Sequence, residues 1–484
     1  MQGDYTRSED LVKTLETLLF RFRPAFGQER VFERAASLVL GTLFAFARKT
    51  MTQLLSGLGQ IQEDWTAAYR LLSRGRFQPK LAAEILFACT LEHVPSQQPY
   101  TAVTDATYAY TAVTDATHVP RSSKKMPGTG WGRTLGSPPW SPGFSRMQRF
   151  ENVSWLTPDQ EGYRRAIPLQ WLHAPTEKSV PSEDAPCREW EAGLSGMRWL
   201  REQLDKNGRP LQTLLVAADG SYDVNKLWQG LPERTVLVCR CAKNRKLFAL
   251  PTAPVQPVRG ARRKYGEQQP PPQQMRLERT SWTKLDIAVR GRMIRMKVRT
   301  AGPFLVQGAP DNPVFLLLVK GYHRRGPHVG KRLPPCQYLV NAIQQEGVWQ
   351  LPLPLPELIA LTWHRWEIEV CHREIKTSFG LGQMQCWSKL GSIVSVQFMA
   401  WAYSVLVLAG YIAWGGLLHA PPHQTAWWSR GKRWSVSTLL QAYRAQLWRG
   451  NAIHPVYPVT CNKGPDNRQW NWALTNAAMT STRG

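Results

Sequence analysis

Three charged residues near position 370 have the types and the spacing to act on a phosphodiester. Arg365, Glu369 and Lys376 lie four and then seven residues apart in the segment LTWHRWEIEVCHREIKTSFGLG, residues 361–382. These steps place all three on one face of a helix. A carboxylate between two cations suits a metal-bound acid beside a phosphate, although a salt-bridged solvent face has the same spacing.

Other acids follow predicted strands. LQTLLVAADGSYD, residues 211–223, begins as a buried strand and reaches Asp219, and a helix is predicted from VNKLWQGL directly after it. RTVLVCR, residues 234–240, is a further predicted strand. This alternation indicates an α/β sheet with acids at the carboxyl ends of its strands, where such sheets place their sites.

A tandem repeat carries one more candidate acid. YTAVTDAT occurs at residues 100–107 and again at 110–117. The offset of ten is even, so the two faces of the strand stay in phase and either copy fits one position in a sheet. The second copy runs into HVPRSSKKMPGT, a basic loop suited to phosphate contact, so the sequence favours Asp115 over Asp105.

The overall composition indicates which kinds of partner and compartment suit the chain. A formal charge of +26 points to a polyanion, with nucleic acid ahead of an anionic membrane. The eight Cys form no C-x-x-C pair, which argues against a zinc ribbon or a disulfide framework and fits a reducing cytoplasm. The polar, acidic N-terminus does not resemble a secretory signal. Residues 391–417 are apolar enough to cross a bilayer, but their internal Ser, Gln and Gly favour a buried core helix.

The chain is expected to have several regions. They are a helical N-terminal DNA-binding region (1–95), a first part of the core with Asp115 and Asp219 (96–240), a basic β-rich insertion (241–355), a second part of the core with the Glu369 helix and the buried helix (356–420), and a basic Trp-rich C-terminal region (421–484). Within the insertion, WTKLDIAVRGRMIRMKVRT alternates apolar and cationic residues, which predicts a strand with one cationic face.

Three acids from distant segments suit metal-assisted phosphoryl transfer. Two hard cations about 3.5–4 Å apart can clamp the attacking and leaving oxygens of a phosphodiester. Carboxylate oxygens are the ligands that Mg²⁺ prefers. Asp115, Asp219 and Glu369 could supply such oxygens, but three acids alone are a weak signal in a chain of this length, and the Arg-Glu-Lys spacing makes the pattern specific.

The chain resembles a DDE transposase of bacterial insertion sequences, in the clan whose last acid lies in a Tyr-(2)-Arg-(3)-Glu-(6)-Lys signature. Arg365, Glu369 and Lys376 match that spacing, and Thr362 stands in the Tyr position. TDATHVPRSS and AADGSYD are similar to the segments of the first and second acids. The resemblance covers residues 30–420.

This resemblance implies a fold and a mechanism. The fold is α/β, a ribonuclease-H-like catalytic core with a β-rich insertion plus helical N-terminal and C-terminal regions. Asp115, Asp219 and Glu369 would be the catalytic acids and would hold two Mg²⁺ ions, for which Mn²⁺ can substitute, and Arg365 and Lys376 would contact DNA phosphates. Water would free a 3′-OH at each element end, and that hydroxyl would then attack target DNA. The protein would act as a DNA-bridged homodimer in the bacterial cytoplasm, associated with the nucleoid and not with a membrane.

The sequence leaves several alternatives open. If the register of this helix were shifted, Glu367 or Glu374 would be the third catalytic acid in place of Glu369. Whether the DNA end passes through a hairpin intermediate is left open, because Thr362 stands in the position of the signature Tyr. The chain could also be a nuclease without strand transfer, a membrane protein built on 391–417, or an inactive or domesticated DNA-binding derivative whose site the duplication disrupts.

Overall fold

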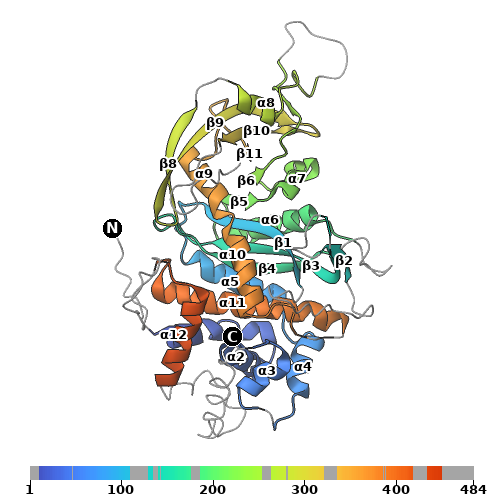
Figure 1. Ribbon diagram of the computed structural model, residues 1–484, viewed down its shortest axis with the longest axis vertical. Coiled ribbons are helices and arrows are strands. Elements are labelled where there is room, and N and C mark those ends of the chain that lie inside the picture. Colours follow the sequence, from blue (N-terminus) through green and yellow to red (C-terminus); the bar gives the residue numbers. More distant parts are fainter. Residues whose placement is uncertain are drawn as a thin grey trace.

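The structure is a computed structural model. It describes residues 10–45, 47–60, 62–109, 129–133, 140–141, 143–175, 186–252, 263–278, 282–320, 335–384, 386, 388–417 and 433–449. Within these ranges, eleven strands join one mixed sheet with helices packed around it (Figure 1). The predicted mixed α/β fold is confirmed to this extent.

The centre of the sheet is built from apolar, β-branched segments. Its strands in spatial order are β4 (Ala166–His173), β3 (Phe144–Leu156), β1 (Tyr100–Ala109), β5 (Leu214–Ala218) and β6 (Thr235–Arg240), and β2 (Gly130–Arg133) extends β3. β3 is antiparallel to β1 and β4, whereas β5 and β6 run parallel to β1. The two parallel crossovers carry α6 (Glu189–Lys206) and, after β5, η2 (Gly220–Tyr222) and α7 (Asn225–Gly230).

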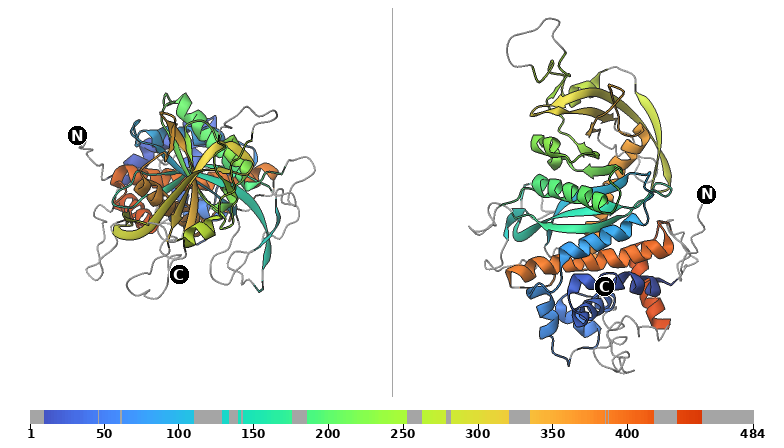
Figure 2. Two further views of the ribbon diagram at one scale, coloured as in Figure 1. Left: turned by 90° about the horizontal axis from the view of Figure 1, so that it is seen from above. Right: turned by 180° about the vertical axis from the view of Figure 1, so that it is seen from behind.

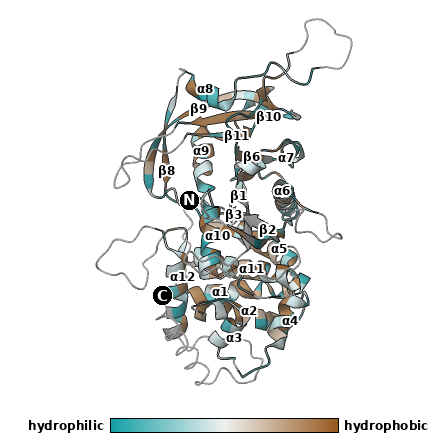
Figure 3. Cartoon of the chain, turned by 45° about the vertical axis from the view of Figure 1, so that its right-hand side comes forward, coloured by the Kyte–Doolittle hydropathy of each residue, from teal (hydrophilic) through white to brown (hydrophobic). Residues whose placement is uncertain are grey.

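The segment between β6 and the last core helices continues the same sheet. Its elements are β7 (Leu247–Phe248), α8 (Pro272–Leu277), β8 (Thr283–Val289), β9 (Arg292–Val306), β10 (Ala309–Val319), β11 (Cys336–Asn341) and the small hairpin β12 (Ile343–Gln345) and β13 (Val348–Gln350). β11 pairs antiparallel with β6, so the insertion shares backbone hydrogen bonds with the core. The hydrophobic stretch of β10 is visible in Figure 3. The predicted alternation on β9 is present, with Met296 and Val298 buried and Lys297 exposed.

A second contact ties the insertion to the core. The turn between β8 and β9 has positive φ at Arg290 (51°) and Gly291 (69°), as a tight hairpin turn requires. The Arg290 amide donates to the Gly162 carbonyl over 2.8 Å, and the Gly291 amide donates to the Glu161 carbonyl over 2.9 Å. A Cβ at Gly162 would lie 2.6 Å from the Ala288 backbone, so only glycine permits this approach.

The remaining helices cover the sheet, most of them from beneath (Figure 1). They are α1 (Leu11–Phe20), η1 (Arg23–Phe26), α2 (Glu29–Phe44), α3 (Met51–Gly57), α4 (Thr66–Ser73), α5 (Pro79–Leu91), α9 (Leu355–His364), α10 (Glu367–Ser378), α11 (Lys389–Trp414) and α12 (Val436–Arg449). The long helix α11 lies between the sheet and the N-terminal helices (Figure 2, right).

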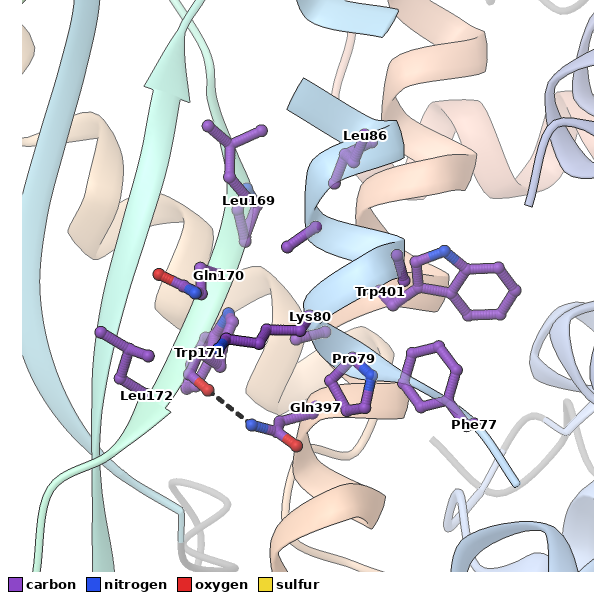
Figure 4. A pocket seen from close by; sticks show the side chains of 14 residues that line it. Phe77, Pro79, Lys80, Leu86, Leu169, Gln170, Trp171, Leu172, Gln397 and Trp401 are labelled. Carbon is purple, nitrogen blue, oxygen red and sulfur yellow. Dashed lines mark hydrogen bonds between the residues drawn. The ribbon is translucent and has the colours of Figure 1, made fainter. Parts of the chain in front are cut away.

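Helix α11 is a buried core helix, as predicted. Among the described residues it is the one helix long and apolar enough to cross a membrane, and 89% of its most apolar window is buried inside the protein. Its polar side chains cap the carbonyls of β4, which pairs on one side only. Ser404 Oγ donates to Pro168 O over 2.7 Å, and Gln397 Nε2 donates to Trp171 O over 2.8 Å beside a cavity of about 110 Å³ (Figure 4). These bonds protect the edge of the sheet from further pairing.

A buried lysine closes the end of α2. Lys49 is 4% exposed, and its ammonium donates to the Thr42 carbonyl over 2.7 Å and to the Ala45 carbonyl. Arg444 of α12 donates to the neighbouring Leu43 carbonyl over 2.6 Å. Burial, with a smaller contribution from Arg444, lowers the pKa of Lys49 to about 7.

We expect this lysine to make folding stability depend on pH. The folded pKa lies below the unfolded one, so between pH 7 and 10.5 the unfolded state binds more protons and stability rises with pH. One proton contributes about 1.4 kcal/mol per pH unit. In urea unfolding at pH 7.5 and 9.5, Lys49→Met should remove that increment relative to the wild type. An equal pH slope in both proteins would contradict the assignment.

Candidate active site

The parallel register of β1 and β5 brings two aspartate positions to the same level, one just after β5 and one within β1. β5 is fully buried and ends at Ala218, and Asp219 follows it, half-buried, without a capping hydrogen bond from its side chain. β1 and β5 pair in parallel with Val103 level with Ala217. Continuing this register by two residues places the backbone of Asp105 level with Asp219. Asp115 lies outside the described residues, so the preference for that copy stays a prediction.

The predicted acid on the later helix has a distinct environment. Glu369 lies in the first turn of α10, and its Oε1 is 3.0 Å from Arg365 Nη2. The helix predicted through this segment is broken between His364 and Glu367, but Arg365 and Trp366 keep αR backbone angles. Arg365 and Glu369 therefore still share a face, and 34% of the Glu369 side chain is exposed. Lys376 is half-buried two turns further along the same helix.

A buried hydrogen bond fixes α10 against the sheet. Asn152 Nδ2 lies 2.9 Å from His372 Nε2, and Asn152 Oδ1 accepts a bond from Ser154. Burial, and to a smaller extent Lys376, lowers the pKa of His372 to about 3, so the ring is neutral and accepts the amide proton. Asn152 is also the β3 partner of Asp105 in the β1 pairing. The turn of α10 after Glu369 thus lies over the strand pair that carries Asp105.

The two neighbouring acids are engaged in ion pairs. Glu367 is 4% exposed, with Oε1 3.1 Å from Arg290 and Oε2 2.6 Å from Arg433. Glu374 accepts a bond from the Tyr403 hydroxyl over 2.8 Å and faces Arg165 at 3.5 Å.

These ion pairs separate the three glutamates by role. Glu367 and Glu374 join α10 to the insertion, α11 and the segment leading into α12. Glu369 is the most exposed of the three and the best placed to meet a ligand.

A cleft with a cationic lining includes Arg365, the ion-pair partner of Glu369. It encloses about 490 Å³ between the α9–α10 junction, the end of β6 and the insertion. Four cations line it, Arg240, Arg290, Lys320 and Arg365, together with Tyr338, Thr362, Trp363, His364, Trp366 and the acid Glu367. Such a lining is suited to phosphate groups. The sequence reasoning missed Arg240 and Lys320, although Arg240 ends a predicted strand, which was the available signal.

The donor chemistry of the site fits a divalent cation. Asp219 and Glu369 offer hard carboxylate oxygens, which suit Mg²⁺, and both are accessible to solvent in part. Among the side chains that the structure describes, no three His, Cys, Asp or Glu groups converge as a metal site. The side chain of Asp105 is not among them, so a third carboxylate at that strand position is compatible with this result.

Together, two aspartate positions level with one another on adjacent strands, an acid on a packed helix and a cationic cleft fit a nuclease of the mixed α/β class. A family model described as DDE superfamily endonuclease matches residues 21–302, more than half of the chain, and the chain belongs to that family. This confirms the predicted relationship to DDE-type transposases. The match ends before Arg365, so it does not include the Arg-Glu-Lys segment. No curated protein matches the chain. Membership implies nuclease chemistry, a DNA substrate and a requirement for divalent metal ions.

Proposed function

We propose that the protein is the DNA transposase of an insertion sequence. It would cleave the element ends to free a 3′-OH and then join that end to target DNA. The observation that carries the proposal is the chain of backbone and side-chain contacts from Glu369 to Asp219. It runs from α10 through His372 and Asn152 to β1, and from β1 through its parallel register to β5.

The strand order supports a ribonuclease-H-like core as part of this proposal. Three antiparallel strands, β4, β3 and β1, precede two strands parallel to β1, and α10 returns to the sheet after the insertion. β1 is continuous from Tyr100 to Ala109, so the first copy of the repeat keeps its place between β3 and β5. This continuity favours an active enzyme over a derivative disrupted by the duplication.

We assign the residues the following roles. Asp219, Glu369 and one aspartate of the repeat would hold two Mg²⁺ ions, which when bound supply charge stabilisation at the scissile phosphate. The sequence favours Asp115 as the first acid, whereas the register of the described strands favours Asp105. Arg365 would orient the phosphate beside Glu369, and Lys376 would contact DNA further along the helix. We further propose a DNA-bridged homodimer acting at the bacterial nucleoid, with residues 1–95 as a DNA-binding region.

The proposal is tested by following cleavage and joining separately. Supercoiled plasmid is incubated with protein and Mg²⁺, new 3′-OH ends are labelled with terminal transferase, and joined products are detected by sequencing. Asp219→Asn is expected to lower nicking by about 10³-fold or more, because the ligand lost acts together with the other acids. Nicking that persists in EDTA would contradict the metal mechanism. Cut DNA without any joined product would instead identify a nuclease that lacks strand transfer.

A further inference from the structure

The β2–β3 ribbon extends the sheet past the end of β1. β2 pairs antiparallel with the first residues of β3, with Trp131 opposite Arg146 and Arg133 opposite Phe144. Asn152, the partner of Asp105, lies eight residues further along β3 than Phe144. The ribbon therefore reaches about 26 Å from that strand position. In the view from above, these strands project beyond the rest of the sheet (Figure 2, left).

The two faces of this ribbon differ sharply. Residues directly opposite one another, and residues two apart on a strand, share a face. Trp131, Phe144 and Arg146 consequently lie on one face, which we call the aromatic face. The other face carries Gly130 and Gly132 of β2 and, opposite them, Met147 and Ser145 of β3, so it holds no aromatic residue at these positions.

The aromatic face is exposed and organised. Trp131 is 61% exposed and Phe144 is 62% exposed, whereas most other aromatic rings in the described part of the chain are not exposed. The Arg146 guanidinium lies 6.0 Å from the Trp131 ring centroid, and it donates to the Thr129 carbonyl and hydroxyl over 3.0 and 2.8 Å. Trp140, in the connection between the strands, is 85% exposed. Large exposed rings around a fixed cation indicate a binding surface.

The charge of this part of the chain selects the ligand. From Ala116 to Phe150 there are six Lys or Arg (Arg121, Lys124, Lys125, Arg133, Arg146 and Arg149) and no Asp or Glu. A polyanion is attracted to such a segment, whereas a purely apolar partner gains nothing from its charge. Exposed rings beside cations are the arrangement that stacks nucleic-acid bases while holding the backbone.

We propose that the aromatic face binds unpaired bases of a DNA strand that crosses the carboxyl ends of β1 and β5. Bases would stack on Trp131 and Phe144, and Arg146 would contact the phosphate between them. The diagonal placement of the two rings, about 7–8 Å between backbones, suits neighbouring nucleotides of an extended strand. This inference rests on the proposed function for the presence of DNA at that edge, and it adds a strand-separated substrate to it.

The test measures DNA binding without catalysis. Full-length protein in EDTA is titrated into fluorescein-labelled dT15 and into a 15-base-pair duplex, followed by anisotropy. The double variant Trp131→Ala with Phe144→Ala is expected to bind dT15 about tenfold more weakly or worse, because each stacked base contributes appreciably. Its duplex affinity should change less than about twofold, since paired bases offer no face to the rings. Trp131→Phe with Phe144→Tyr should restore dT15 binding.

A matched control and a direct readout accompany this titration. Leu211→Ala removes another exposed apolar side chain, 78% exposed and just before β5 at the opposite end of the sheet, and it should leave both affinities unchanged. If the double variant does not fold, 5-iodouracil photocrosslinking of the wild-type protein to single-stranded DNA should label the peptide from Thr129 to Met147.

Three results would overturn the inference. The first is that the double variant binds dT15 as tightly as the wild type. The second is that its affinities for single strand and duplex fall equally. The third is a change of oligomeric state in light scattering without a change in DNA affinity, which would assign the face to a second copy of the chain. The binding assay contains no metal, so it does not depend on catalysis. If the wild-type protein nicks DNA but the double variant binds dT15 as tightly as the wild type, only this inference fails. If the double variant binds dT15 more weakly but the wild-type protein does not nick DNA, only the transposase proposal fails.

Discussion

Asp105→Asn is expected to abolish metal-dependent nicking, with a loss of about 10³-fold or more, whereas Asp115→Asn should leave the rate within about threefold of wild type. The reason is positional. Tyr100–Ala109 pairs with β3 on one side and β5 on the other, so the strand position level with Asp219 is occupied by the first copy of the repeat.

The two variants are unusually well matched, because the same substitution is made in the same eight-residue sequence, YTAVTDAT. Differences between them report position alone. Plasmid nicking rates in Mg²⁺ provide the measurement, and thermal unfolding confirms that both variants fold. The opposite pattern would restore Asp115, which the sequence favours. Loss of activity only in the double variant would show that the two copies exchange.

Glu369→Gln and Glu367→Gln are expected to separate catalysis from stability. Glu369 forms a partly exposed pair with Arg365, and such pairs contribute only about 0.3–0.5 kcal/mol, so its loss should leave the melting temperature unchanged while nicking falls about 10³-fold. Glu367 is nearly buried between Arg290 and Arg433. Its neutralisation leaves Arg433 poorly compensated and should cost about 2–4 kcal/mol, less than a fully buried pair because Arg290 is half-exposed.

The readouts for this pair are the urea midpoint and the nicking rate at low temperature, where the Glu367 variant is still folded. Glu367→Gln should retain nicking within about tenfold under those conditions, since both carboxylate oxygens of Glu367 are already engaged by arginines. Loss of nicking in a stable Glu367 variant, together with an active Glu369 variant, would move the third acid by two residues and refute the Arg-Glu-Lys assignment.

The predictions of Asp219 and Glu369 as site residues rest on local sequence patterns. A buried run ending in an acid predicted β5 and the position of Asp219, and helical spacing predicted the face shared by Arg365 and Glu369. The interruption of that helix at Arg365 was not predicted, because both junction residues keep helical angles and leave no sequence mark.

Long-range pairing explains what the sequence could not provide. β6 and β11 are neighbours although about 100 residues separate them, and neither strand encodes its partner. The cationic cleft follows from that pairing, since it brings Arg240 beside Tyr338. The choice between Asp105 and Asp115 was equally hidden, because identical copies have identical local preferences and only the sheet distinguishes them.

The position of α11 has a consequence for synthesis of the protein. Most of the surface that covers this helix, from α1, α4, α5 and β4, precedes it in the chain by more than 200 residues, so the ribosome completes that part first. The most apolar segment therefore emerges when both of its neighbouring layers already exist and can enclose it at once. A chain whose N-terminal helices were deleted would instead release a 26-residue apolar helix covered on the β4 side alone, and the machinery that inserts membrane proteins would compete for it.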